Sequence, residues 1–199
     1  EGQNAAAVNP NASYAQVFGQ VGVTRYGGDI EAGGSGNILM GSEGDDTLYA
    51  VNSDPSAGGA YVVFAGSGND VIHVSGEFQT EYIDGGAGIN TVQFDGANMT
   101  IDLSLAFEAA NIQKLDLGEA NNTLMLDVSQ LLDRPTDAFT VTGTGNAMGS
   151  GTHQLIVDGD NGDNVQIDLT SGAGWHAGAD WNYAGHTYHV YNNVDQHVQ

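Results

Sequence analysis

The feature that most constrains the fold of this chain is a nine-residue pattern of glycine and aspartate. Its copies are GSEGDDTLY at 41–49, AGSGNDVIH at 65–73 and GGAGINTVQ at 85–93, all close to the form G-G-x-G-x-D-x-U-x, where U is a large apolar residue. The glycines allow a tight backbone turn, and the apolar position predicts Leu48, Ile72 and Val92 as core residues. Each copy therefore predicts a turn followed by a strand that faces inward.

The spacing of the copies predicts how they lie in space. Asp46 and Asp70 are 24 residues apart, and Asp70 and Asn90 are 20 apart. Two nonapeptides form one turn of a parallel β-coil, so equivalent turns recur about every 18 residues. We therefore expect these turns to stack along one side, with insertions at 50–64 and 76–84.

The polar residues of the turns predict a metal site. Asp46 and Asp70 carry carboxylates at the repeated position, where Asn37 and Asn90 carry amides. Asp45, Asn69 and Asp84 are second-choice ligands close by in the sequence. Carboxylate and amide oxygens suit a hard cation, and the chain has no cysteine to bind a softer metal. The prediction is several Ca²⁺ ions.

A second acidic segment lies outside the repeats. Asp158, Asp160, Asn161 and Asp163 resemble the start of an EF-hand loop, although no helix precedes them and no glutamate stands at the twelfth position. The alternative is a hairpin turn between LIV and VQI. We hypothesise a calcium site at Asp158, Asp160 and Asp163, whose calcium has open coordination positions for an anionic ligand. Asp160 and Asn161 are the ligand-binding candidates of this segment.

Composition excludes several partners. The chain has 25 acidic residues against three basic ones, Arg25, Lys114 and Arg134, and a formal charge of −22. Such a surface repels nucleic acid and anionic membranes. No stretch approaches the roughly 20 apolar residues of a membrane span. We expect neither nucleic-acid binding nor membrane insertion.

The remaining segments predict a single β-rich domain over 1–199. Residues 1–31 are expected to form capping strands, 32–93 the repeats, 94–134 further β-structure with a short helix, and 135–199 a β-hairpin region. Asp127 and Gln130 fit the N-cap and N3 positions of a capping box. The predicted class is mainly β: a short, irregular, calcium-binding parallel β-roll or solenoid, continuous with additional strands and one short helix.

Aromatic residues and histidines are frequent in the last third. Trp175 and Tyr183 are candidate ligand-binding residues, although such aromatic side chains also form cores. His186 and His189 are three residues apart, and strand residues at that spacing face opposite sides. We interpret the histidines as surface or packing residues and not as a zinc site.

The quoted nonapeptides resemble those of the RTX proteins, which bacteria secrete in one step. The later segments NIQKLDLGEANNTLMLDVSQLL, HQLIVDGDNGDNVQIDL and YAGHTYHVYNN are similar to the C-terminal extracellular region of large RTX adhesins. The resemblance covers about residues 32–199. It implies that Asp46 and Asp70 bind calcium outside the cell, and that a peptide-binding domain lies close to the repeats.

The expected function is a non-catalytic, calcium-dependent binding module of a secreted or cell-surface bacterial adhesin. Its expected ligand is a peptide or protein segment, with a carbohydrate second, and its role is attachment to cells, surfaces or biofilm. We expect a monomeric module within a larger chain. Two alternatives stay open: a structural spacer that folds with calcium, and a polysaccharide-modifying module. The motifs H-E-x-x-H and G-x-S-x-G are absent from the sequence.

Overall fold

The computed structural model describes residues 14–15, 24–26, 37–50, 61–75, 80–103, 108–119, 121–132, 134–167 and 174–199. Over these ranges the chain is mainly β, as expected, and the helix with described bounds is the short α2 (Val128–Leu132). Most of the expected capping region 1–31, and the insertion residues 51–60 and 76–79, lie outside the described residues.

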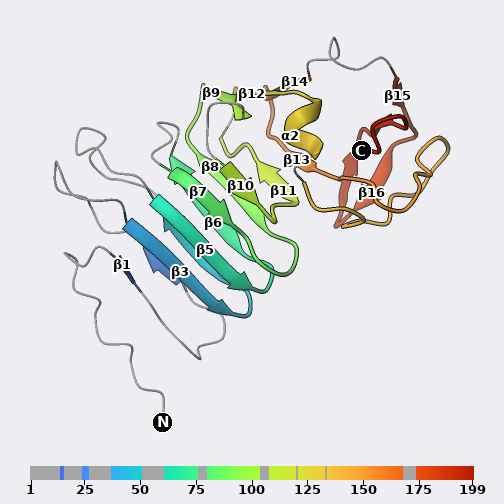
Figure 1. The fold of residues 1–199 in the computed structure, drawn as a ribbon. Coiled ribbons are helices and arrows are strands. Elements are labelled where there is room, and N and C mark those ends of the chain that lie inside the picture. Colours follow the sequence, from blue (N-terminus) through green and yellow to red (C-terminus); the bar gives the residue numbers. More distant parts are fainter. Residues whose placement is uncertain are drawn as a thin grey trace.

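Parallel strands build most of the molecule (Figure 1). Sheet A contains, in order, β1 (Tyr14–Ala15), β3 (Asn37–Glu43), β5 (Tyr61–Ser67), β7 (Thr80–Asp84) and β10 (Glu108–Ala110). Sheet B contains β2 (Thr24–Tyr26), β4 (Thr47–Ala50), β6 (Val71–Ser75), β8 (Thr91–Asp95), β11 (Lys114–Asp116) and β13 (Ile156–Asp158). Sheet C contains β9 (Thr100–Asp102), β12 (Thr123–Leu126) and β14 (Asn164–Ile167).

The chain passes between sheets at each turn, because consecutive strands from β3 to β8 belong alternately to sheets A and B. The register aligns Thr47 with Val71 and Val71 with Thr91. The turns before these three residues therefore lie above one another, which confirms the stacking predicted from the spacing.

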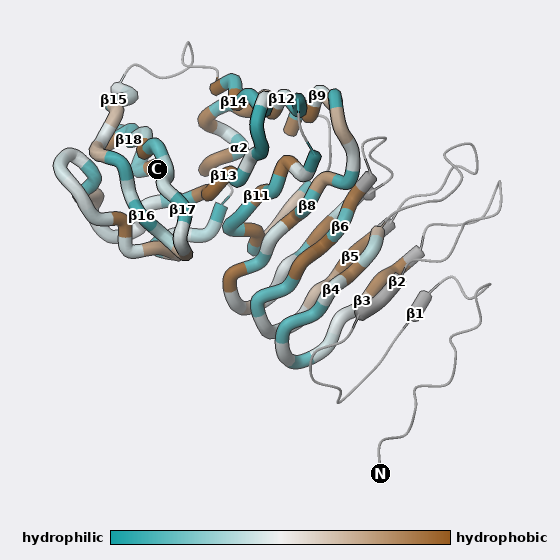
Figure 2. The backbone as a smooth tube through the Cα atoms, turned by 180° about the vertical axis from the view of Figure 1, so that it is seen from behind, coloured by the Kyte–Doolittle hydropathy of each residue, from teal (hydrophilic) through white to brown (hydrophobic). Residues whose placement is uncertain are grey.

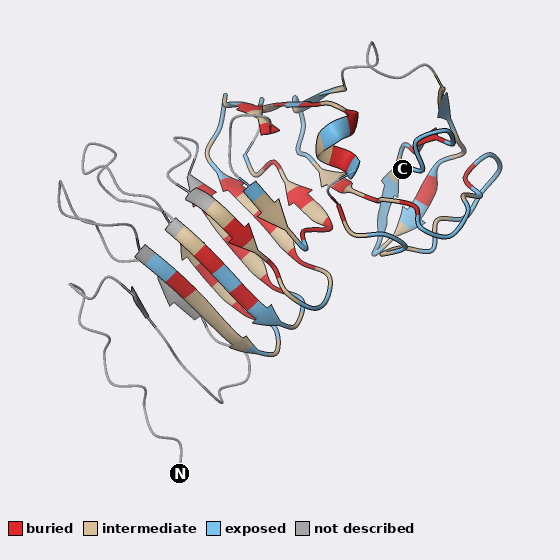
Figure 3. Cartoon of the chain, in the orientation of Figure 1, coloured by how far each residue is buried: buried red, intermediate tan, exposed pale blue. Residues whose placement is uncertain are grey.

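The core lies between the sheets, because alternate residues of each strand point inward. Sheet A contributes Leu39, Val63 and Ile83, and sheet B contributes the predicted Leu48, Ile72 and Val92. Figure 3 shows the resulting bands of buried residues across neighbouring strands, and Figure 2 shows the matching alternation of apolar and polar residues.

The helix α2 has the predicted capping box. The backbone N–H of Asp127 donates to Gln130 Oε1 at 2.6 Å, and Asp127 Oδ1 accepts from the Ser129 N–H at 2.7 Å and the Gln130 N–H at 3.3 Å. The bond from the Ser129 hydroxyl is the main cause that lowers the pKa of the Asp127 carboxyl. The buried residues Val128 and Leu131 attach the helix to the rest of the molecule.

The C-terminal residues form a lobe beyond the parallel sheets, at the end away from β1 (Figure 1). Here β15 (Trp175–Ala177) pairs with β18 (Tyr191–Asn193), and β16 (Trp181–Tyr183) pairs with β17 (His186–Tyr188), both antiparallel. A second core cluster contains Ile156, Trp181 and Val190. In the described residues no helix is long and apolar enough to cross a membrane.

The alternative for residues 159–163, a hairpin turn between LIV and VQI, is not formed. The strands on either side, β13 and β14, do not pair with each other: β13 extends sheet B beside β11, and β14 extends sheet C beside β12. The turn between them therefore links two sheets, as the turns of the repeats do.

Candidate functional site

One side of the molecule presents a series of aligned turns, 41–46, 65–70, 85–90 and 111–113, which we name the Asp70 stack. Each turn leads from sheet A to sheet B. The turns approach so closely that a Cβ atom on Gly68, whose φ is +132°, would lie 2.4 Å from the carbonyl carbon of Gly44. Glycine is therefore required at this position.

A ladder of side chains links successive turns inside the Asp70 stack. The Asp46 N–H donates to Asp70 Oδ1 at 2.8 Å, the Asp70 N–H to Asn90 Oδ1 at 3.0 Å, and the Asn90 N–H to Gln113 Oε1 at 2.6 Å. All four side chains belong to buried residues. The repeated acid or amide position therefore satisfies the backbone of the turn before it.

Asp46 and Asp70 differ in what surrounds their carboxylates. The carboxylate of Asp46 accepts from the backbone N–H and the hydroxyl of Ser42, at 2.5 and 2.9 Å. Asp70 Oδ1 accepts from Asp46, but Asp70 Oδ2 is buried without a hydrogen-bond partner among the described residues. The pKa of Asp70 is raised to about 6: desolvation by burial is the main cause, the nearby carboxylates of Asp46 and Asp45 add to it, and the bond from the Asp46 N–H opposes it.

A second ladder runs along the exposed side of the same stack. The Asn69 N–H donates to Asp45 Oδ1 at 2.7 Å, and the Ile89 N–H donates to Asn69 Oδ1 at 2.8 Å. These bonds run in the opposite sense to those of the inner ladder. Asp45 and Asn69 therefore join adjacent turns, close to the carboxylates of Asp46 and Asp70.

The other predicted ligands of the repeats occupy different surroundings. Asn90 lies in the inner ladder, but its Nδ2 also donates to the Asn111 carbonyl at 3.0 Å, so both ends of its amide are bonded. Asp84 ends β7, where Oδ1 accepts from the Gly86 N–H and the Asn111 amide at 2.9 and 2.7 Å. Asn37 lies in β3, where it pairs with Tyr61 of β5, so it is not one of the turn residues that form the inner ladder.

The surroundings of Asp70 fit a hard cation. A buried carboxylate oxygen without a partner is costly, and a Ca²⁺ ion bound by carboxylate and backbone oxygens would satisfy it. Acidic and histidine side chains do not gather in groups of three with metal-site geometry in the described part of the chain. A calcium ion here would therefore take much of its coordination from backbone carbonyls.

The opposite side of the molecule carries a second series of turns, 96–99, 117–122 and 159–163, which we name the Asn122 stack. The Met99 N–H donates to Asn122 Oδ1, and the Asn122 N–H donates to Asp163 Oδ1, both at 2.7 Å. Asp163 Oδ2 accepts from the Asp160 N–H at 2.6 Å. Both oxygens of Asp163 are therefore bonded by backbone groups.

Asp158 and Asp160 lie on either side of Gly159 but have different roles. Asp158 Oδ2 binds Lys114 Nζ at 2.8 Å, and its Oδ1 accepts from the Tyr188 hydroxyl at 2.5 Å. Burial and this bond raise the pKa of Tyr188. Asp158 thus joins two strands of sheet B to the C-terminal lobe, whereas Asp160 and Asn161 are exposed.

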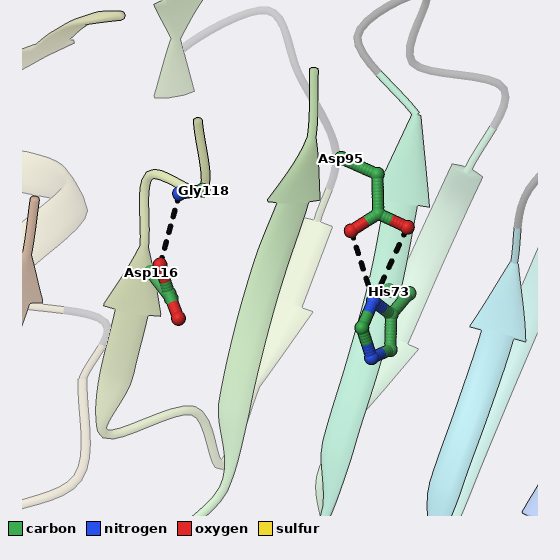
Figure 4. A network of polar contacts seen from close by, with 4 residues as sticks. All are labelled: His73, Asp95, Asp116 and Gly118. Carbon is green, nitrogen blue, oxygen red and sulfur yellow. Dashed lines mark hydrogen bonds and ion pairs between the residues drawn. The ribbon is translucent and has the colours of Figure 1, made fainter. Parts of the chain in front are cut away.

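Asp160 borders an acidic cleft of about 410 Å³ together with Asp95, Asp116 and Glu119. Figure 4 shows that Asp95 is turned toward His73, whose Nδ1 lies 2.9 Å from Asp95 Oδ1. In the same view Asp116 Oδ1 accepts from the Gly118 N–H at 2.9 Å. Two of these four carboxylates are therefore engaged within the protein.

A larger, mostly apolar cavity of about 750 Å³ lies between the last strands of the parallel sheets and the C-terminal lobe. Leu126 and Leu131 line it from one side, and Trp181 and Val190 from the other. Trp175 also lines it, and its buried Nε1 has no hydrogen-bond partner in the described ranges. This volume and lining are typical of ligand pockets.

The predicted ligand residues do not converge on one place. Trp175 lines the apolar cavity, whereas Asp160 and Asn161 belong to the Asn122 stack. Tyr183 stacks on Trp181 at 4.7 Å between ring centroids and packs against Phe139 in the second core cluster. Trp181 reaches the cavity where we expected Tyr183.

The sequence interpretation missed Gln113 and Asn122, the residues that continue the ladders. Their spacing could have identified both, because each accepts a bond from a backbone N–H 23 residues earlier in the chain, and the repeated acidic positions are 24 and 20 residues apart. It also missed Asp95, Asp116 and Glu119, which come together only when strands β8 and β11 pair.

No protein-family model, curated protein sequence or solved structure matches this chain.

Proposed function

We propose that the chain is a calcium-dependent ligand-binding module of a secreted bacterial RTX adhesin, which attaches the adhesin to cells, surfaces or biofilm. The observation that carries the proposal is the buried carboxylate of Asp70, with one oxygen in the ladder and the other without a partner in the described structure. An acid that only bonded the backbone would have its second oxygen bonded or in water, whereas the second oxygen of Asp70 is buried.

Calcium would supply the positive charge that the Asp70 stack lacks. Asp70, Asp46 and Asp45 would hold the ion together with carbonyl oxygens of their turns, as in a calcium-binding β-roll. Neutralising these carboxylates would favour the aligned turns over the unfolded chain, so binding and folding would be coupled. The low calcium of the cytoplasm would leave the chain loose, and extracellular calcium would fold it.

The apolar cavity supports a ligand-binding role over a pure spacer, because a spacer has no use for an open pocket of about 750 Å³ beside Trp175. A peptide or protein segment is the favoured ligand, since His189 is the one acidic or basic residue among the described residues that line the cavity. Charged sugars would find no counter-charge there.

Two measurements test the proposal. Thermal melting of the chain with 5 mM calcium and with chelator should differ by several degrees, as for any ion that binds the native state alone. Identical melting curves would remove the calcium part. An array of peptides and glycans probed with the calcium-loaded chain tests the ligand part, and a silent array would leave a calcium-folded spacer.

A further inference from the structure

The apolar cavity follows the edge of strand β14. Val165, Gln166 and Ile167 all line it. Successive side chains of a strand point to opposite faces, so three consecutive lining residues mean that the cavity borders the strand along its backbone. Among the described strands β14 pairs with β12 alone, which leaves its other edge toward the cavity.

The backbone groups on that edge can be assigned from the register. The Asn164 N–H donates to the Asn122 carbonyl of the neighbouring chain segment at 2.8 Å. Backbone groups of alternate residues point to the same side, so Asn164 and Gln166 face β12, and Val165 and Ile167 face away from it. The N–H and C=O groups of Val165 are therefore directed to the open edge.

The end of sheet B differs in this respect. Next to β13, the Leu155 N–H donates to the Gln199 carbonyl at 3.1 Å, and the Gln199 N–H donates to the His153 carbonyl at 2.9 Å. The C-terminal residues thus already occupy the edge at the start of β13. The edge of β14 has no such cover from described residues.

The charges around the cavity restrict its occupant. The lining residues include neither acidic nor basic side chains apart from His189, which contacts Asp180 at 2.8 Å. The chain as a whole carries a formal charge of −22. A second copy of this chain or an acidic segment would be repelled, whereas an apolar segment with basic ends would be attracted.

We propose that an extended peptide with an apolar centre and basic ends binds as a fourth strand of sheet C, along the edge of β14. Its backbone bonds to Val165 and Ile167, and its apolar side chains enter the cavity beside Leu126 and Trp175. Such strand addition takes affinity from main-chain bonds and specificity from pockets for alternate side chains. This inference rests on the proposed function, because it specifies the peptide ligand.

The test uses the whole chain with calcium and a library of octapeptides that are acetylated and amidated at their ends. Lysine occupies both ends, and valine, isoleucine, leucine, phenylalanine or threonine vary at the interior positions. We expect at least one member to bind, and its copy with N-methyl groups on alternate residues along one edge to bind about tenfold more weakly, because hydrogen bonds are lost. Glutamate in place of both lysines should also weaken binding.

Two variants locate the site. Val165→Pro removes an N–H that faces the open edge and leaves the bonds to β12, so it should weaken the best peptide about tenfold. Val165→Ala, the matched control, keeps the N–H and should change affinity less. If Val165→Pro does not fold, the N-methylated peptides decide the question alone.

The outcomes separate this inference from the proposed function. Equal binding of the methylated and unmethylated peptides would overturn strand addition, as would binding of small apolar compounds that the peptides fail to displace. If no capped octapeptide binds but peptides with free carboxyl ends do, this inference is wrong and the proposed function stands. If no peptide of either kind binds, both fail.

Discussion

The two series of turns are linked by ladders of the same kind, but the acidic residue is bonded differently in each. In the Asn122 stack the terminal acid, Asp163, accepts backbone N–H groups on both oxygens. In the Asp70 stack the acid in the middle of the ladder accepts on one oxygen and buries the other. An aspartate in an aligned turn is therefore no evidence for a metal by itself, and the unpartnered oxygen is what distinguishes Asp70.

In the Asn122 stack an amide side chain forms the bonds between turns. The Nδ2 of Asn122 shares its two hydrogens among the carbonyls of Gly96, Leu117 and Glu119, which lie 2.7, 2.6 and 2.5 Å away. Its Oδ1 accepts from the Met99 N–H, so one neutral side chain bonds both to its own turn and to the turn before it. A carboxylate cannot donate, and at the equivalent place in the other stack Asp70 leaves one of its own oxygens without a partner among the described residues.

The largest effect should come from closing the space between turns of the Asp70 stack. In Gly68→Ala the new Cβ would meet backbone atoms of Gly44 at 2.4 and 2.5 Å, at a φ of +132°. We expect a loss of about 3 kcal/mol or more in the free energy of unfolding, measured by urea denaturation in calcium.

The matched control is Gly162→Ala in the Asn122 stack. Its Cβ would lie 2.6 Å from Asn121 Oδ1, a side-chain atom that can move, at a φ of +99°. The expected loss is about 1 kcal/mol, from the left-handed backbone alone. If the two variants lost the same free energy of unfolding, the close contact between turns of the Asp70 stack would add nothing to the cost of the substitution.

The second-largest effect should be the gain in stability on adding calcium, which we expect to depend on Asp70 and not on Asp163. At a concentration 100 times Kd the ion stabilises the folded chain by about 2.7 kcal/mol. Asp70→Asn should abolish this increment, because the amide places a donor where the free oxygen was, as Asn90 does one turn on. Asp163→Asn should lower stability with and without calcium by about the same amount. Differential melting with calcium and with chelator measures both, and an unchanged increment in Asp70→Asn would exclude Asp70 as a ligand.

The features that could be predicted from the sequence are those that depend on residues close together in the chain or on regular spacing. Leu48, Ile72 and Val92 were identified from a repeated position, and all three are buried. The helix cap at Asp127 depends on residues three apart and was also correct. Stacking followed from the distances between acidic residues, because parallel strands in register keep equivalent turns together.

What the sequence did not reveal depends on pairings between distant segments. Asp158 fits the start of a calcium loop, yet Lys114 and Tyr188 occupy its oxygens, and neither is near it in sequence. The bond from Asn122 to Asp163 spans 41 residues. The difference between Asp46 and Asp70 arises from Ser42, which stands where the next copy has Gly66. These relations exist only once strand register is fixed.

A change in the next turn would sharpen the comparison further. Asn90→Asp removes the Nδ2 donor to Asn111 and places a second carboxylate below Asp70. Without calcium we expect a loss of about 2 kcal/mol from the buried, unsatisfied acid. With calcium most of that loss should be recovered, so that the calcium increment exceeds that of the wild type. A variant equally unstable in both conditions would show that this turn cannot contribute to a cation site.

The smallest effect is a pH dependence of the calcium-free chain. The pKa of Asp70 is raised to about 6 in the folded state, above its usual value of 3.8, chiefly by burial. The folded state then binds more protons than the unfolded state, so the contribution of Asp70 to stability is present at low pH and is lost as pH rises through 6. Between pH 5 and pH 7 the free energy of unfolding of the wild type in chelator should fall by about 1 kcal/mol relative to that of Asp70→Asn, whose amide does not titrate.

Comparing the two proteins cancels the contributions of the other carboxyl groups to the pH dependence. These include Asp127, whose lowered pKa acts in the opposite sense at lower pH. Parallel stability curves for the two proteins would mean that the Asp70 carboxylate is hydrated in solution, and the contrast between the stacks would then lose its physical basis.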